Sequence, residues 1–212
     1  MLTRRWVLQC AAASALVFDS QKAEAIRQCT GNSCIAGVDL EEFYEEAYDE
    51  QEKSQWCWAA SISMIFSYYQ HPVEQRRIVR TVYGSTSNLP AMSGATIAAQ
   101  LNRSWTDDNG QKFKSRLRAA FDADVGVFAI DARTMVRALR RDQPMIVGTR
   151  SHAMVLTSVQ YVGSEESPNI IRAGVFDPYP GRGSRSLQQD ELVPIFQGGS
   201  LRFIGLPIVM DA

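Results

Sequence analysis

The pattern of apolar and polar positions after residue 57 is first that of helices. From Trp58 to Tyr69, apolar side chains recur at helical spacing, which lays one apolar face along a helix from 57 to about 70. Three shorter helices are predicted at 73–83, 94–101 and 131–141. Gly84 stops the first of these, and Asp131 is a suitable N-cap for the last.

The later part of the chain has the pattern of β-strands. Four apolar runs, separated by clusters of Gly, Pro, Ser and Asn, predict strands at 145–149, 153–161, 170–176 and 201–209. A hairpin is predicted between Trp105 and Phe121, because Asp108-Asn109-Gly110 is a tight-turn sequence. Helices therefore precede an antiparallel sheet, which indicates an α+β domain of two packed parts rather than alternating βαβ units.

Size and charge narrow the class of protein. The chain has 212 residues, of which 45% are hydrophobic, and this is enough for one domain with one core. Its net charge of −1 argues against binding to nucleic acid, which calls for a basic surface. After residue 25 no apolar run reaches the roughly 18 to 20 residues that span a bilayer, so no membrane contact is expected after signal removal. The acidic stretch 41–52 is predicted to be a solvated lead-in.

Residues 1–25 have the arrangement of a signal peptide. Arg4-Arg5 precede an apolar stretch at 10–18, and Ala23-Glu24-Ala25 is an A-x-A cleavage site. The arginine pair favours a twin-arginine signal, with a Sec signal as the alternative. Cys10 stands at the very start of the apolar stretch, without small residues before it, which argues against a lipoprotein. We therefore expect export to the periplasm or the medium.

Signal removal leaves three cysteines. Cys29 and Cys34 are separated by Thr-Gly-Asn-Ser, a flexible turn that lets them close a small disulfide in an oxidising compartment, within an N-terminal arm at 26–50. Cys57 is then unpaired, as a thiol nucleophile must be, although a buried inert cysteine would be unpaired as well. The absence of a CxxC pair argues against a zinc site and thiol redox chemistry, and no cofactor is implied.

The most informative segment surrounds Cys57, which lies where the long helix is predicted to begin. Unpaired N–H groups and the helix dipole favour the thiolate there. Gln51 offers an amide donor that can lie beside the sulfur, and with the backbone N–H of Cys57 it would form an oxyanion hole. Gln55 is the alternative amide donor. Trp56 and Trp58 are expected to pack rather than to contact substrate.

The sequence Gln-x5-Cys-Trp-Ala-Ala-Ser that starts at Gln51 resembles the active-site segment of papain-like cysteine peptidases, in the form found in bacterial secreted and effector peptidases. In that family the catalytic His begins a late strand, and an Asp or Asn follows on the next one. Ser151-His152 and Asp177-Pro178 match both features. The resemblance covers about 51–180, and it implies a papain-like domain at 51–212 with an N-terminal helical part packed on a C-terminal antiparallel sheet.

The resemblance implies that His152 is the base of Cys57 and that Asp177 orients the His152 ring. The count of histidines supports this, because His71 is the only other one and lies about 20 Å away at the far end of the predicted helix. Taken alone, His152 could be a structural strand histidine and Asp177 a turn cap. The best-known papain relatives have Asn as third member and a long propeptide, and the short segment before Cys57 gives no support for such a propeptide.

The predicted function is that of an exported cysteine peptidase, which hydrolyses peptide bonds of a protein or peptide substrate through a thioester acyl-enzyme. The same three side chains can carry out acyl transfer or glutamine deamidation, and an exported hydrolase also meets cell-wall peptides. A non-catalytic binding module with a papain-like fold is the alternative from another class. The sequence does not indicate the oligomeric state or the cleavage-site preference.

Overall fold

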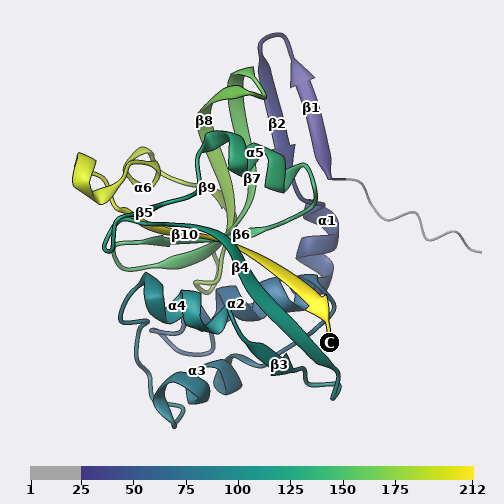
Figure 1. Ribbon diagram of the computed structural model, residues 1–212, viewed down its shortest axis with the longest axis vertical. Coiled ribbons are helices and arrows are strands. Elements are labelled where there is room, and N and C mark those ends of the chain that lie inside the picture. The colour runs from purple at the N-terminus through teal and green to yellow at the C-terminus, as the bar shows by residue number, and fades with distance from the viewer. Residues whose placement is uncertain (1–24) are drawn as a thin grey trace, which may run out of the picture.

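A computed structural model describes residues 25–212 (Figure 1). Residues 1–24 of the predicted signal peptide, including Cys10, lie outside the described residues. The helical elements are α1 (Leu40–Glu42), the π-helix η1 (Phe43–Ala47), α2 (Cys57–Tyr68), α3 (Gln75–Tyr83), α4 (Gly94–Gln100), α5 (Ala132–Leu139), α6 (Gln189–Leu192) and the 3-10 helix η2 (Ile195–Gln197). The strands are β1 (Ile26–Thr30), β2 (Ser33–Gly37), β3 (Ser104–Thr106), β4 (Lys112–Asp122), β5 (Val127–Phe128), β6 (Met145–Thr149), β7 (Ala153–Ser164), β8 (Ser167–Asp177), β9 (Gly183–Ser186) and β10 (Leu201–Asp211).

The strands form one antiparallel sheet in the order β1-β2-β7-β6-β10-β4-β3, with β5, β8 and β9 joined at its sides. Strand β7 pairs with three other strands. Strand β8 pairs along one edge of β7, while β6 and then β2 pair along the other. Helices α2, α3 and α4 gather at one end of the molecule, below the sheet in the view of Figure 1. The predicted α+β domain of two packed parts is confirmed.

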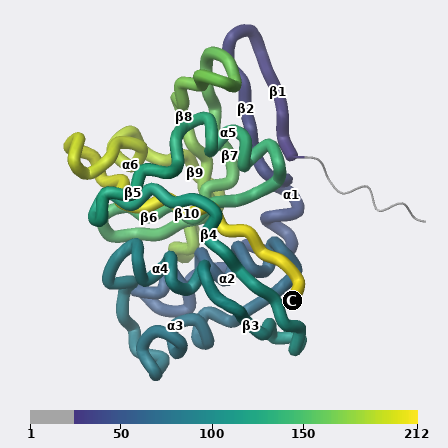
Figure 2. The backbone as a smooth tube through the Cα atoms, in the orientation of Figure 1, coloured from purple at the N-terminus to yellow at the C-terminus, as the bar shows by residue number. Residues whose placement is uncertain are grey.

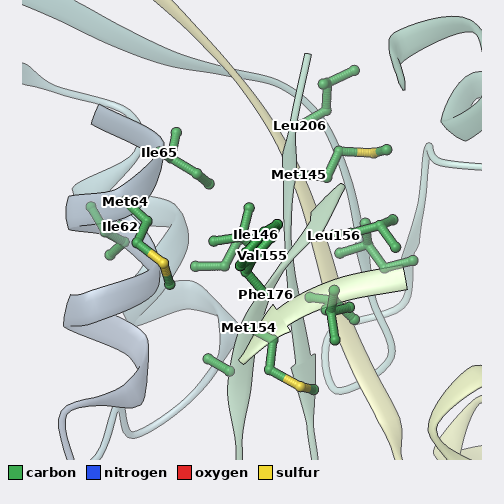
Figure 3. Close-up of a cluster of buried hydrophobic side chains, with 14 of the residues drawn as sticks. Ile62, Met64, Ile65, Met145, Ile146, Met154, Val155, Leu156, Phe176 and Leu206 are labelled. Atoms are coloured by element: carbon green, nitrogen blue, oxygen red, sulfur yellow. The ribbon is translucent and has the colours of Figure 1, made fainter. Parts of the chain in front are cut away.

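The core lies where α2 packs on the sheet. Ile62 and Ile65 of α2 are fully buried and face Ile146 of β6 and Val155 of β7 (Figure 3). Each such side chain contributes about 1.5 to 3 kcal/mol by leaving water. Because this interface fixes α2 against β6 and β7, it also fixes the start of the helix next to the start of β7.

The elements that the periodicity predicted are present with small shifts. Helices α2, α4 and α5 and strands β6, β7, β8 and β10 agree with the predicted ranges, and Asp131 caps α5 by accepting the N–H of Thr134. Helix α3 begins two residues later than predicted, because Glu74 keeps an extended backbone. The predicted hairpin is β3–β4, and its turn contains Gly110 at φ +84°.

The N-terminal arm adds to the sheet. Strands β1 and β2 form a hairpin that projects away from the end of the molecule that holds α3 (Figure 2), and a disulfide joins Cys29 to Cys34 across it. Residues Ser33–Gly37 pair with β7, so the arm is attached to the same strand that follows His152. No helix of the described residues combines the length and the apolar character needed to cross a bilayer.

The prediction that 41–52 is a solvated lead-in is wrong for its apolar positions. The carboxylates of Glu45 and Glu46 are exposed, but Phe43 and Ala47 are buried, four positions apart on the same face. The Phe43 ring centroid lies 4.8 Å from that of Phe176, at the end of β8. The high acidic content concealed a short amphipathic helix that covers the core behind Asp177.

Candidate active site

Three segments that are far apart in the sequence meet at one end of the sheet. Cys57 is the first residue of α2, His152 directly precedes β7, and Asp177 is the last residue of β8. Strands β7 and β8 are antiparallel, and Val155 pairs with Phe176, so the beginning of one strand lies beside the end of the other. His152 Nε2 therefore comes to 2.5 Å from Asp177 Oδ1.

The same imidazole interacts with the thiol of Cys57, which is the free cysteine of the described residues. Because Nε2 faces Asp177, Nδ1 is the ring nitrogen left for the sulfur. Cys57 is 9% exposed and lies at the N-terminus of α2, where backbone N–H groups lack acceptors within the helix. Sulfur, imidazole and carboxylate therefore form a continuous row.

Burial lowers the pKa of His152, but hydrogen bonds to Asp177 and Cys57 and their charges outweigh burial and raise this pKa to about 9. His152 therefore carries a proton at neutral pH. An imidazolium beside a sulfur stabilises the thiolate, which is the nucleophilic form.

Asp177 is fully buried. Burial by itself raises the pKa of a carboxyl group, but hydrogen bonds from His152, Arg185 and the N–H of Tyr179 hold the pKa of Asp177 well below its usual range. The bond from Tyr179 means that Asp177 also caps the turn after β8, so the two interpretations of this residue from the sequence are compatible.

Gln51 is buried beside the Asp177-Pro178 turn, and its backbone N–H donates to Pro178 O over 2.8 Å. Its side-chain Nε2 donates one hydrogen to Lys53 O over 3.0 Å, while Oε1 is buried with no hydrogen-bond partner among the described residues. Gln55, the alternative, is exposed and lines the cleft at Cys57. Gln51, by contrast, is not among the residues that line this cleft.

A cleft of about 310 Å³ opens at Cys57 and His152. It is lined by the 90–94 loop, the start of α2, the loop between β6 and β7, and residues of β6, β7 and β10. The indole N–H groups of Trp56 and Trp58 donate to Ser87 O and Leu89 O over 3.0 and 3.2 Å, which holds the segment just before the 90–94 loop. Both tryptophans are 1% exposed, so the prediction that they pack is confirmed, although Trp58 also contributes to the cleft wall.

His71 has a structural environment instead. It is 5% exposed, its ring stacks on Phe113 at 4.5 Å, and its two nitrogens lie 3.0 Å from Asp107 and Asp211. Within residues 25–212 no group of three or more His, Cys, Asp and Glu side chains is arranged to hold a metal ion.

Sequence reasoning missed two residues behind Asp177. Arg185 Nε donates to Asp177 Oδ2 over 2.7 Å, and both terminal nitrogens of Arg185 donate to Glu191 over 2.8 and 2.9 Å. The available signal was the presence of basic residues shortly after the Asp177-Pro178 turn, where β9 folds back on β8.

The family model Peptidase_C70, described as papain-like cysteine protease AvrRpt2, matches residues 41–189. The chain belongs to this family. This C70 peptidase is thus a papain-like cysteine peptidase, and the resemblance found in the sequence is confirmed. The match begins within the segment that contains Phe43, ahead of the Gln51 motif.

Solved structures resemble the C70 peptidase at low identity. A double glycine motif protease from an AMS/PCAT transporter, solved with the leader peptide, is 17% identical with a TM-score of 0.40; the match covers 83% of this chain and 98% of that one. UfSP from C. elegans is 16% identical with a TM-score of 0.45, and the match covers 93% of this chain but only 40% of that one. A search of curated proteins gives no match.

Proposed function

We propose that Cys57 is the nucleophile of this peptidase, that His152 is its general base and acid, and that Asp177 orients the His152 ring. The observation that carries the proposal is the row formed by the free thiol at the start of α2, the imidazole and the buried carboxylate. The alternative base, His71, is engaged by the buried carboxylate of Asp107 and the exposed carboxylate of Asp211.

The proposed reaction begins when the Cys57 thiolate attacks the carbonyl carbon of the scissile peptide bond. The negative oxygen of the tetrahedral intermediate is stabilised by the Cys57 N–H and an amide of Gln51. The imidazolium of His152 gives its proton to the leaving nitrogen as the C–N bond breaks, which leaves a thioester and a neutral imidazole. His152 then takes a proton from water, the hydroxide attacks the thioester, and the sulfur leaves as thiolate beside the restored imidazolium.

We also propose that the enzyme acts on proteins or peptides outside the cytoplasm. The signal sequence predicted at 1–25 and the Cys29–Cys34 disulfide support export, because such bonds persist in oxidising compartments. Replacing Arg4 and Arg5 with Lys in the native host is expected to leave the precursor in the cytoplasm. Undiminished export of this variant would refute the twin-arginine route and favour the Sec alternative.

Catalysis is tested by treating the purified protein with an epoxysuccinyl peptide at neutral pH, locating the adduct by peptide mass, and measuring casein cleavage. Labelling is expected at Cys57, and Cys57→Ala and His152→Ala are expected to abolish casein cleavage. His71→Asn is the matched histidine control and should retain cleavage when folded. Cleavage that persists in Cys57→Ala would refute the assignment, whereas labelling of Cys57 without cleavage of any peptide would favour acyl transfer or deamidation.

A further inference from the structure

The carboxylate of Asp177 belongs to a chain of four side chains with alternating charges. It runs from the imidazole of His152 to Asp177, then to the guanidinium of Arg185 and finally to the carboxylate of Glu191. The side chains of Arg185 and Glu191 are only 20% and 15% exposed. Such pairs are stronger than surface ion pairs, because little water competes with them.

Arg185 is fixed from several sides. It lies on β9 opposite Val175 of β8, which places its side chain beside the end of β8. Its Nε donates to Asp177 Oδ2 over 2.7 Å, while Nη1 and Nη2 form a two-pronged pair with Glu191 and Nη2 also contacts Met154 Sδ at 2.9 Å. The planar fork of the guanidinium is thus held at both ends, a geometry that Lys cannot reproduce.

Glu191 is fixed in turn by α6. Its Oε2 accepts the backbone N–H of Gln188 over 2.8 Å, which closes the capping box of this helix. Because Arg185 occupies Oδ2 of Asp177, Oδ1 remains directed at His152 Nε2. Oδ1 also accepts the N–H of Tyr179 over 2.9 Å, so the bond from Arg185 to Oδ2 fixes the second oxygen and thereby the plane of the carboxylate.

We propose that Arg185 is a positioning residue of the peptidase, which holds Asp177 in the orientation that aligns His152, and that Glu191 holds Arg185. This inference rests on the proposed role of the Cys57, His152 and Asp177 row. Arg185 does not touch the reacting atoms and acts only through Asp177.

Arg182 provides a matched control, because it approaches the same oxygen of Asp177 from the solvent side. Its Nη1 lies 3.4 Å from Oδ2, its side chain is 53% exposed, and its guanidinium lies over the Tyr179 ring. Arg182 therefore holds the carboxylate only through one long, solvent-exposed hydrogen bond, and Arg182→Met should lower kcat by less than about twofold.

The test compares Arg185→Met, Arg185→Lys, Glu191→Gln and Arg182→Met in the full chain, with melting temperature as the check on folding. Steady-state casein cleavage separates kcat from KM. The ring NMR signals of His152 are followed against pH, and they can be assigned because the chain has only two histidines. Loss of one set of signals in His152→Ala identifies them.

For Arg185→Met we expect kcat to fall about 10- to 100-fold with KM nearly unchanged, because a misaligned base affects chemistry rather than binding. The midpoint of the His152 titration should fall by about one pH unit or more as Asp177 loses its alignment. Arg185→Lys should recover part of both effects. Glu191→Gln should lower kcat less, by about 3- to 10-fold, because Arg185 still donates to Asp177 but is itself held less firmly.

The inference is overturned if Arg185→Met is folded and keeps both the kcat and the His152 titration of the parent. If Arg185→Met does not fold, Glu191→Gln and Arg185→Lys decide by the same two readouts, and parental values in both would overturn it. Failure of the proposed function is a separate result, because it would show as casein cleavage that survives Cys57→Ala or His152→Ala.

Discussion

Replacing Asp177 with Asn tests the electrostatics of the site most directly, because the change removes a charge but keeps the size of the side chain. In the parent, the pKa of His152 is raised from 6.5 to about 9. At 1.36 kcal/mol for each pH unit, this corresponds to about 3 kcal/mol of preference for the imidazolium. The combined effect of Asp177 and Cys57 must be larger, since burial acts in the opposite direction.

If Asp177 supplies about half of that preference, the pKa of His152 in Asp177→Asn falls to about 8 or below. In the proposed mechanism the leaving nitrogen takes its proton from the imidazolium, so casein cleavage should be lost as the pH rises through this pKa. We therefore expect the alkaline limb of the pH profile near pH 9 in the parent and at least about one unit lower in the variant.

The pKa shifts of His152 and Asp177 also determine how the stability of the protein depends on pH. The raised pKa of His152 gives a stabilising contribution that is complete below about pH 6.5 and is lost as the pH rises through about 9. The lowered pKa of Asp177 gives a contribution that is present above about pH 4 and is lost on acidification. The difference in unfolding free energy between parent and Asp177→Asn should therefore be largest between about pH 4 and 6.5.

Asp107→Asn is the matched control, because Asp107 lies 3.0 Å from the other histidine, His71, in the core. It is expected to change stability without moving the alkaline limb of casein cleavage. An alkaline limb at the same pH in the parent and in Asp177→Asn would refute the idea that Asp177 supports the imidazolium of His152.

Three further outcomes are expected. Gln51→Ala should lower kcat for casein about 100-fold while Gln55→Ala costs less than about threefold, and equal losses would contradict Gln51 as the oxyanion donor. In urea unfolding, Phe43→Ala should cost about 3 kcal/mol and Tyr44→Ala, at an exposed neighbouring position, less than about 1. Replacing both cysteines of the Cys29–Cys34 disulfide with Ser should cost about 2 kcal/mol and leave casein cleavage unchanged, as the bond closes a short loop in the arm.

The strong periodic patterns predicted most of the fold. The apolar face of α2 and the runs of β6, β7 and β10 are long enough to identify each element and where it begins. The hairpin β1–β2 was not predicted, because its exposed positions carry polar residues such as Arg27 and Gln28 and only Ala36 and Gly37 are buried. The helix around Phe43 was hidden by its acidic neighbours, since two buried positions are too few to show a period.

Only part of the candidate site was predicted from the sequence. Cys57 and His152 belong to short motifs at the ends of predicted elements, and such motifs can be found without knowing the packing. Arg185 and Glu191 lie in short elements where Arg and Glu would ordinarily be surface residues. Only the return of β9 along β8 shows that they are half-enclosed and paired with each other.

The presence of Asp rather than Asn at position 177 nevertheless indicates that a cation such as Arg185 lies nearby. The best-known papain relatives have a neutral Asn there, whereas a carboxylate with no exposed surface is costly unless cations and hydrogen-bond donors surround it. His152 supplies a positive charge only while it is protonated, and in the proposed mechanism it becomes neutral after it gives its proton to the leaving group. Arg185 remains charged throughout the cycle, so it can keep Asp177 ionised and in place during the step in which the imidazole is neutral. A buried Asp at the proposed third position therefore calls for a permanent cation nearby, and the arginines after the Asp-Pro turn are the residues that can supply it.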